Sequence, residues 1–322
     1  LVHGMRLSVH YILTGNCSEI EVDSAATFAD LTQVFLKTFL RKHASVTWTA
    51  GERMLEGNDH ATLASLGLGQ DSVVGVVVTP MPLVLTASFD ATAKLWDAVT
   101  GECRVTFMHR EVVHSAVLSP DGFSVLTASG DGTAKTWDAL TGECQATFRG
   151  HGASISSAVY SPNGSSVLTA SNDGAAKIWD AVTGECQVTL AGHEDLVLRA
   201  KYSPDGRSIL TACYSKTVKI WDALTGECIA APDGYTTKDE IVIQSAVFSP
   251  DGLSVLTGSW ETDAKIWNAV TGECRATLEG HNEQVNCAVY SPDGSCILTA
   301  SADGTAKTWD AVTGECRTTF GT

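Results

Sequence analysis

The sequence has few of the patterns that mark metal, redox or nucleic-acid chemistry. None of its ten cysteines pairs with another in a Cys-x-x-Cys motif, so neither a zinc site nor a thiol redox site is indicated. It also has no cluster of Lys and Arg, and its 21 basic side chains stand against 37 acidic ones. The resulting net charge of −16 repels phosphate backbones, so nucleic acid is not expected as the primary partner.

Long apolar runs and a secretory leader are also missing. The most apolar stretch, residues 73–87, is rich in β-branched side chains and is interrupted by Pro80 and Pro82. It is too short for a membrane-spanning helix and predicts two strands instead, so no membrane insertion is expected. Residues 1–4 precede the first Met and are interpreted as a leader or tag remnant, with a fragment of a longer chain as the alternative.

The cysteines that are present fall mostly at one recurring place. Equivalent positions on successive copies of a unit lie too far apart for disulfide geometry. The pattern therefore predicts free thiols and a reducing, cytoplasmic compartment. The six recurring cysteines, about 42 residues apart, are Cys103, Cys144, Cys186, Cys228, Cys274 and Cys316.

A repeat runs through residues 83–322. Its tryptophans are spaced 41, 42, 42, 46 and 42 residues apart, which predicts a repeat architecture. Each unit holds four short apolar segments separated by turns with Pro, Asp and Gly, as in SAVYSPNG, SVLTAS, AAKIWD and ECQVTL of the third unit. Four short strands make a small antiparallel sheet that cannot bury both faces alone, so the copies must stack. The tryptophans are Trp96, Trp137, Trp179, Trp221, Trp267 and Trp309.

These units resemble the WD-repeat family. Five of the tryptophans are followed by Asp and one by Asn, and Gly-His dipeptides stand at 150–151, 192–193 and 280–281. The resemblance implies that residues 80–322 form a mainly β fold, a β-propeller with six visible units. Either six blades close the ring, or the array continues into a seventh.

The resemblance also implies a structural use for recurring polar side chains. In each blade a His, a Ser of the second strand, an Asp of the next turn and the Trp would form a buried hydrogen-bonded set. A Ser-His-Asp triad is the competing interpretation, but a nucleophile would be unique rather than repeated. No enzyme activity, cofactor or metal is therefore expected. The complete sets are His109, Ser129, Asp131, Trp137; His151, Ser171, Asp173, Trp179; and His281, Ser301, Asp303, Trp309.

Two units depart from the pattern. The fourth has Cys213 in place of Ser and Ser215-Lys216 in place of Asp-Gly, and the fifth has Glu261 in place of Asp after an insertion at 231–240. In three units a large aromatic stands just before the position of the turn Asp. Exposed aromatics are enriched where binding energy is concentrated. We predict that they bind a protein partner, favoured to be basic by the acidic surface; the alternative is that they fill space left by the altered polar sets. The residues at this position are Phe89, Gly130, Asn172, Tyr214, Trp260 and Ala302.

Residues 5–79 do not repeat. Alternating segments at 5–13 and 18–25 predict strands, and the apolar spacing of 27–42 predicts a helix. The order of elements resembles a small α+β ubiquitin-like domain without a free Gly-Gly tail, which implies a built-in recognition module. Trp48 falls near the contact patch of that family, with a core position as the alternative. The stretch 75–88 also resembles the start of a blade; if its first strand stays in the N-terminal domain, the first blade has only three strands.

The function predicted from these features is a non-catalytic protein-interaction scaffold or adaptor. Fold alone does not decide function, so two other roles stay open: a structural docking subunit of a large assembly, and a substrate adaptor in ubiquitin-linked degradation. An enzyme at the channel mouth is disfavoured, because it would need unmatched polar residues from several blades and the copies are too alike.

Overall fold

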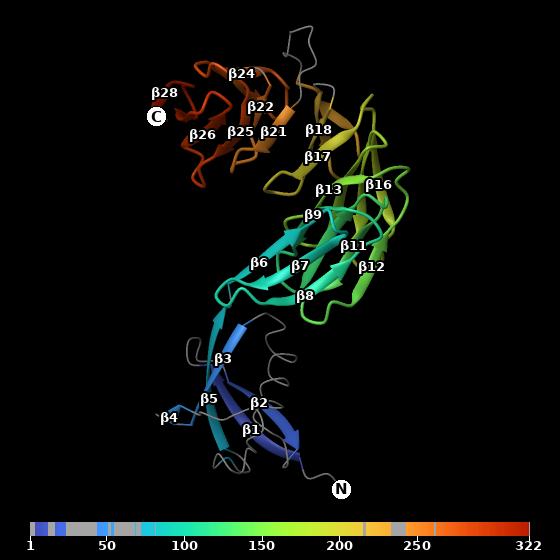
Figure 1. Ribbon diagram of the computed structural model, residues 1–322, viewed down its shortest axis with the longest axis vertical. Helices are drawn as coiled ribbons and strands as arrows, with labels where there is room; N and C mark the ends of the chain where they lie inside the picture. Colours follow the sequence, from blue (N-terminus) through green and yellow to red (C-terminus); the bar gives the residue numbers. More distant parts are fainter. Residues whose placement is uncertain are drawn as a thin grey trace. The chain divides into compact units, whose positions relative to one another are not determined.

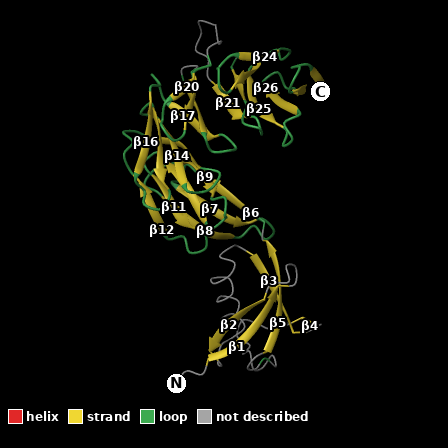
Figure 2. Ribbon diagram, turned by 180° about the vertical axis from the view of Figure 1, so that it is seen from behind, coloured by secondary structure: helices red, strands yellow, loops and turns green. Residues whose placement is uncertain are grey.

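The computed structural model describes residues 4–11, 17–23, 44–50, 53–54, 68, 72–80, 82–214, 217–232, 243–260 and 262–321. Over these residues the regular structure is entirely strand (Figure 2), and the helix predicted at 27–42 lies outside them. A search of the same residues finds no helix of the length and hydrophobicity needed to cross a membrane. The chain divides into two compact units, residues 1–84 with 96–104 and residues 85–95 with 105–322.

The N-terminal sheet has five strands in the order β2-β1-β5-β3-β4. Its central strand β5 runs parallel to β1 and antiparallel to β3, with Val74 opposite Val9 and Val76 opposite Trp48. The valine-rich sequence of β5 suits a strand that has neighbours on both sides. The strands are β1 (Gly4–Tyr11), β2 (Cys17–Asp23), β3 (Ala44–Ala50), β4 (Arg53–Met54) and β5 (Ser72–Pro80).

Sheet one contains three strands because β5 is already paired in the N-terminal sheet. The ambiguous stretch 75–88 is therefore divided between the two sheets, and the three-stranded alternative is the one observed. The turn after β6 contains Ala91 at φ 67°, where sheets two and three have Gly132 and Gly174 at φ 76° and 83°. This left-handed conformation favours glycine, so Ala91 is strained. Sheet one comprises β6 (Leu83–Ala87), β7 (Thr92–Asp97) and β8 (Cys103–Met108).

Sheets two to six each contain four antiparallel strands in sequence order. Figure 1 follows them along the chain from β9 to β28. Sheet two is β9 (Val113–Leu118), β10 (Ser124–Ser129), β11 (Ala134–Asp138) and β12 (Cys144–Phe148); sheet three is β13 (Ile155–Tyr160), β14 (Ser166–Ser171), β15 (Ala175–Asp180) and β16 (Cys186–Ala191); sheet four is β17 (Val197–Tyr202), β18 (Ser208–Cys213), β19 (Val218–Asp222) and β20 (Cys228–Ala230); sheet five is β21 (Ile243–Phe248), β22 (Ser254–Ser259), β23 (Ala264–Asn268) and β24 (Cys274–Leu278); sheet six is β25 (Val285–Tyr290), β26 (Cys296–Ser301), β27 (Ala306–Asp310) and β28 (Cys316–Phe320).

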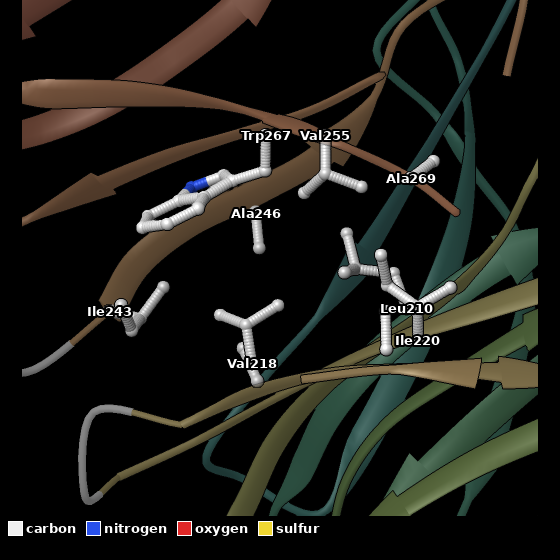
Figure 3. Close-up of a cluster of buried hydrophobic side chains, with 10 residues drawn as sticks. Leu210, Val218, Ile220, Ile243, Ala246, Val255, Trp267 and Ala269 are labelled. Atoms are coloured by element: carbon white, nitrogen blue, oxygen red, sulfur yellow. The ribbon is translucent and has the colours of Figure 1, made fainter. Parts of the chain in front are cut away.

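The core of the second unit lies between neighbouring sheets. Figure 3 shows the cluster between sheets four and five, where Leu210, Val218 and Ile220 face Ile243 and the fully buried Trp267. Equivalent residues form the clusters between sheets two and three, three and four, and five and six. Stacking of the copies is confirmed, and the reason is burial of the apolar face that each sheet would otherwise expose.

Sheet six buries only one of its faces. Leu298 is 44 % exposed and Phe320 is 53 % exposed, whereas the equivalent Leu256 and Leu278 of sheet five are 0 % exposed. The difference follows from position, since sheet six lies on sheet five and covers those two residues.

Nine of the ten cysteines, all except Cys17, form no disulfide, and they include all six that recur at the repeat position. These six lie at the start of the fourth strand of their units, or of the third strand in sheet one, and their side chains are exposed. The prediction that they do not pair is confirmed.

Candidate functional site

A hydrogen-bonded relay runs through sheet three from the Trp to the Asp. Trp179 Nε1 donates to Thr169 Oγ1 over 2.8 Å, and Thr169 Oγ1 lies 2.7 Å from His151 Nε2. His151 Nδ1 lies 2.8 Å from Asp173 Oδ2. A carboxylate only accepts, so Nδ1 carries the proton and Nε2 accepts from the threonine. Sheets two and six repeat the relay with Trp137, Thr127, His109 and Asp131, and with Trp309, Thr299, His281 and Asp303.

Each predicted serine is bonded to the Asp of its set, but the hydroxyl that links the Trp to the His belongs to the threonine two residues earlier. Ser171 stands at the end of β14, where its hydroxyl donates to the Ser154 carbonyl and accepts the Asp173 amide. It therefore fixes the turn rather than the ring of His151. Ser129 and Ser301 do the same in sheets two and six. The signal that could have identified the threonine is its presence in all six units: Thr86, Thr127, Thr169, Thr211, Thr257 and Thr299.

The relay does not have the geometry of a catalytic triad. Ser171 makes its hydrogen bonds with backbone groups rather than with His151. The hydroxyl that does meet His151 belongs to Thr169, which is 0 % exposed and cannot reach a substrate. The relay therefore holds strands together.

The predicted binding aromatics lie on one kind of turn. We name aspartate turns those that join β6 to β7, β10 to β11, β14 to β15, β18 to β19, β22 to β23 and β26 to β27. In the second unit neighbouring sheets stack through equivalent strands, β9 against β13, β13 against β17 and β21 against β25. Equivalent turns of stacked sheets therefore fall on the same side of the stack.

The three aromatics on these turns are exposed. Phe89 is 85 % exposed, Tyr214 is 42 % exposed and Trp260 is 41 % exposed. Phe89 meets the ring of His114 edge to face at 6.4 Å between centroids, and the Tyr214 amide donates to the carbonyl of Leu196. The Tyr214 backbone is held by this bond, and much of each of the three rings faces solvent.

The comparisons with known proteins agree with this repeat pattern. The family described as WD domain, G-beta repeat matches residues 101–138, 142–180, 184–222, 226–268 and 272–310, together more than half of the chain. The chain belongs to this WD40 family. No curated protein matches the chain. WD40 repeats generally mediate protein–protein interaction and scaffolding.

Two parts of the predicted site lie wholly or partly outside the description of this WD40 protein. Trp48 is placed on strand β3 by its backbone, but its side chain lies outside the described residues, as does most of the insertion 231–240. Ser215, Lys216 and Glu261 lie outside them as well.

Electrostatics in the relays of sheets two and three favour neutral histidine beside ionised aspartate. Burial alone would raise the pKa of Asp131, but hydrogen bonds from Thr133, the Arg110 amide and His109 lower it to about 2. Burial lowers the pKa of His109 and of His151, against the opposing effect of their aspartates. Each relay thus carries one negative charge that is fully hydrogen-bonded.

The fourth unit replaces the aspartate contact with a hydroxyl. His193 Nδ1 lies 3.0 Å from Thr217 Oγ1, and its Nε2 lies 2.6 Å from Thr211 Oγ1. Trp221 still donates to Thr211, and in the fifth unit Trp267 still donates to Thr257, each over 2.7 Å. The Trp–Thr bond therefore survives in both altered units.

The missing aspartate predicts that His193 makes the fold sensitive to acid. Burial and then Lys219 lower the pKa of His193 to about 4, from an ordinary value of 6.5. As pH falls through this window the unfolded chain takes up the proton first, so stability is full above about pH 6.5 and is lost toward pH 4. Between pH 7 and 5 this one group should cost about 1–2 kcal/mol, allowing for its partial exposure.

The measurement is urea unfolding of the wild type and of His193→Gln at both pH values. The variant should lose less stability between pH 7 and 5 than the wild type does. Equal losses in the two proteins would show that His193 does not carry the effect.

Proposed function

We propose that this WD40 protein is a non-catalytic scaffold or adaptor that binds a protein partner through its aspartate turns. One observation carries the proposal. Phe89, Tyr214 and Trp260 are exposed at a turn position where the other sheets have Gly130, Asn172 and Ala302. Exposed aromatics cost solubility, and they are retained where a partner covers them.

The net charge supports a basic partner, and the cysteines without disulfides support a reducing compartment. The chain carries a net charge of −16, most of it in the repeats. Complementary charge speeds encounter and selects partners more than it adds affinity. Capture should therefore weaken with rising salt, and a cytoplasmic partner is proposed.

The N-terminal unit is proposed to be a ubiquitin-like recognition module, with Trp48 as a contact residue. Support comes from the five-stranded sheet, which contains strands β1 and β2 where the segments at 5–13 and 18–25 predicted them. The repeat sheets are proposed to be blades of a β-propeller, closed with six units or part of a seven-bladed array. A docking subunit of a fixed assembly and a degradation adaptor remain the alternative roles.

The aromatic surface is tested by the double substitution Tyr214→Ala with Trp260→Ala. Partner capture should weaken by at least ~2 kcal/mol, because anchor side chains carry most of the binding energy. The melting temperature should change little, since both rings are partly exposed. The measurement is quantitative mass spectrometry of proteins retained from native extract, followed by the affinity of each retained protein.

Leu224→Ala with Val270→Ala is the matched control. These exposed apolar residues belong to the same two sheets but lie on the turns after β19 and β23, at the opposite ends of the strands. The control should retain the same proteins as the wild type. If the aromatic variant melts much earlier and still captures partners in proportion to its folded fraction, the aromatics are packing residues and the proposal fails.

A further inference from the structure

A cavity of about 700 Å³ lies between sheets two and three. It is lined by the turn after β9, by the turn after β15 and by side chains of β10, β11, β12 and β13. These turns lie at the ends of the strands opposite to the aspartate turns, because consecutive hairpins of an antiparallel sheet alternate ends. The cavity is therefore separate from the proposed partner surface.

Two hydroxyl groups in this cavity are buried without a hydrogen-bond partner in the described structure. One is Thr136 Oγ1, on a residue only 3 % exposed, and the other is Tyr160 Oη. Burial, and then the Asp121 carboxylate, raises the pKa of Tyr160 against the opposing effect of the nearby Ser124 hydroxyl, whose approach falls short of a full hydrogen bond; the Tyr160 hydroxyl therefore keeps its proton and acts as a donor. Buried polar groups are normally paired, and exceptions mark places where another molecule supplies the partner.

The other sheet interfaces show what is particular to this one. Smaller cavities of about 520 Å³ and 290 Å³ contain Tyr202 and Tyr290 at the place of Tyr160. At the place of Thr136 they contain Ile178 and Ile266, which offer no hydroxyl. Within the described residues, the tyrosine hydroxyls of all three cavities lack a hydrogen-bond partner, so the cavity between sheets two and three is distinguished by its larger volume and by the second such hydroxyl, that of Thr136.

The lining defines the chemistry of a ligand. Asp121 is its one charged side chain, and two bonds already reach the Asp121 Oδ1, from the Ser119 hydroxyl at 2.6 Å and from the Phe123 amide at 3.0 Å. This carboxylate repels anions. A cation would find no second negative side chain in the lining to offset the free energy of removing it from water.

The remaining groups favour a ligand with several hydroxyls. Hydroxyl and amide side chains both donate and accept, and Ser124 already donates to the Gln145 amide oxygen over 2.9 Å. Pro120, Ala181 and Val182 add an apolar strip suited to C–H groups. The volume lies within the range of small-molecule sites.

We propose that the cavity between sheets two and three binds a small neutral polyhydroxylated molecule, a sugar or polyol, through Thr136 and Tyr160. This site is independent of the protein-scaffold function and lies at the opposite ends of the strands. The ligand hydroxyls accept from Tyr160 and exchange hydrogen bonds with Thr136, while its C–H face lies on the apolar strip.

The test measures binding of maltose and myo-inositol to the full chain by saturation-transfer NMR and calorimetry, with inorganic phosphate and methylammonium as charged comparators. At least one neutral probe should bind saturably, and the charged probes should not displace it. Tyr160→Phe and Thr136→Ile should each weaken that binding at least about tenfold. Phenylalanine stands at the position equivalent to Tyr160 in sheet five (Phe248), and isoleucine stands at the position equivalent to Thr136 in sheet three (Ile178). Both variants are therefore expected to fold.

Tyr202→Phe is the matched control, since it removes the same hydroxyl from the neighbouring cavity and should leave the affinity unchanged. The proposal is overturned if neither neutral probe saturates up to about 50 mM. It is also overturned if both cavity variants bind like the wild type, or if Tyr202→Phe weakens binding equally. Melting curves of all three variants confirm that folded protein is compared.

Discussion

Leu256→Ala is expected to lower the free energy of unfolding by about 2–5 kcal/mol, whereas Leu298→Ala should lower it by less than about 1 kcal/mol. The two leucines occupy the same place in sheets five and six. Leu256 is 0 % exposed in the cluster that joins these sheets, and its truncation leaves a cavity. Leu298 is 44 % exposed, so truncation removes little buried area.

Chemical denaturation of both variants measures the difference. Leu210→Ala, between sheets four and five, is a second core variant and should resemble Leu256→Ala. If Leu298→Ala costs as much as the two core variants, the open face of sheet six is covered by another surface in solution.

Thr169→Val should cost about 2–4 kcal/mol, because it leaves both the Trp179 N–H and the His151 Nε2 without a buried partner. Valine has nearly the same shape, so packing changes little and the loss reports the hydrogen bonds. Ser171→Ala should cost about 1 kcal/mol, since the Ser171 hydroxyl serves only the turn.

The two variants are compared by thermal and urea unfolding at pH 7, where His151 is neutral in the fold. Thr211→Val is expected to match Thr169→Val, because Trp221 and His193 make the same contacts with Thr211. If Ser171→Ala lowers the free energy of unfolding more than Thr169→Val does, the serine and not the threonine is the residue that links the Trp to the His.

The strands and their stacking could be predicted from the sequence because they depend on local signals. Turn residues such as Gly132 and Gly174 separate segments of fixed period, and each segment alternates as a strand does. The stretch 75–88 could not be divided by such signals, since its valines suit either sheet. Its division follows from long-range pairing of β5 with β1 and β3.

The candidate sites were predictable only in part. The exposed aromatics break a repeat, so Tyr214 and Trp260 stood out against Gly130 and Asn172 in the sequence. Both Ser171 and Thr169 recur, and although the presence of the threonine in all six units favours it, the level of the His151 ring along the strand, which decides the choice, comes only from the structure. The cavity with Thr136 and Tyr160 depends on two sheets lying side by side, which no spacing within one unit reveals.

The sheets have similar core residues, so their packing faces do not select a neighbouring sheet over a distant one. The order in which the sheets assemble is instead determined by the length of the connections between them. The connection from β12 to β13 has six residues and can span at most about 20 Å. Sheet three therefore reaches sheet two before it reaches any other sheet. Twelve residues join β20 to β21, about twice that reach. The chain length therefore constrains assembly least at the junction of sheets four and five.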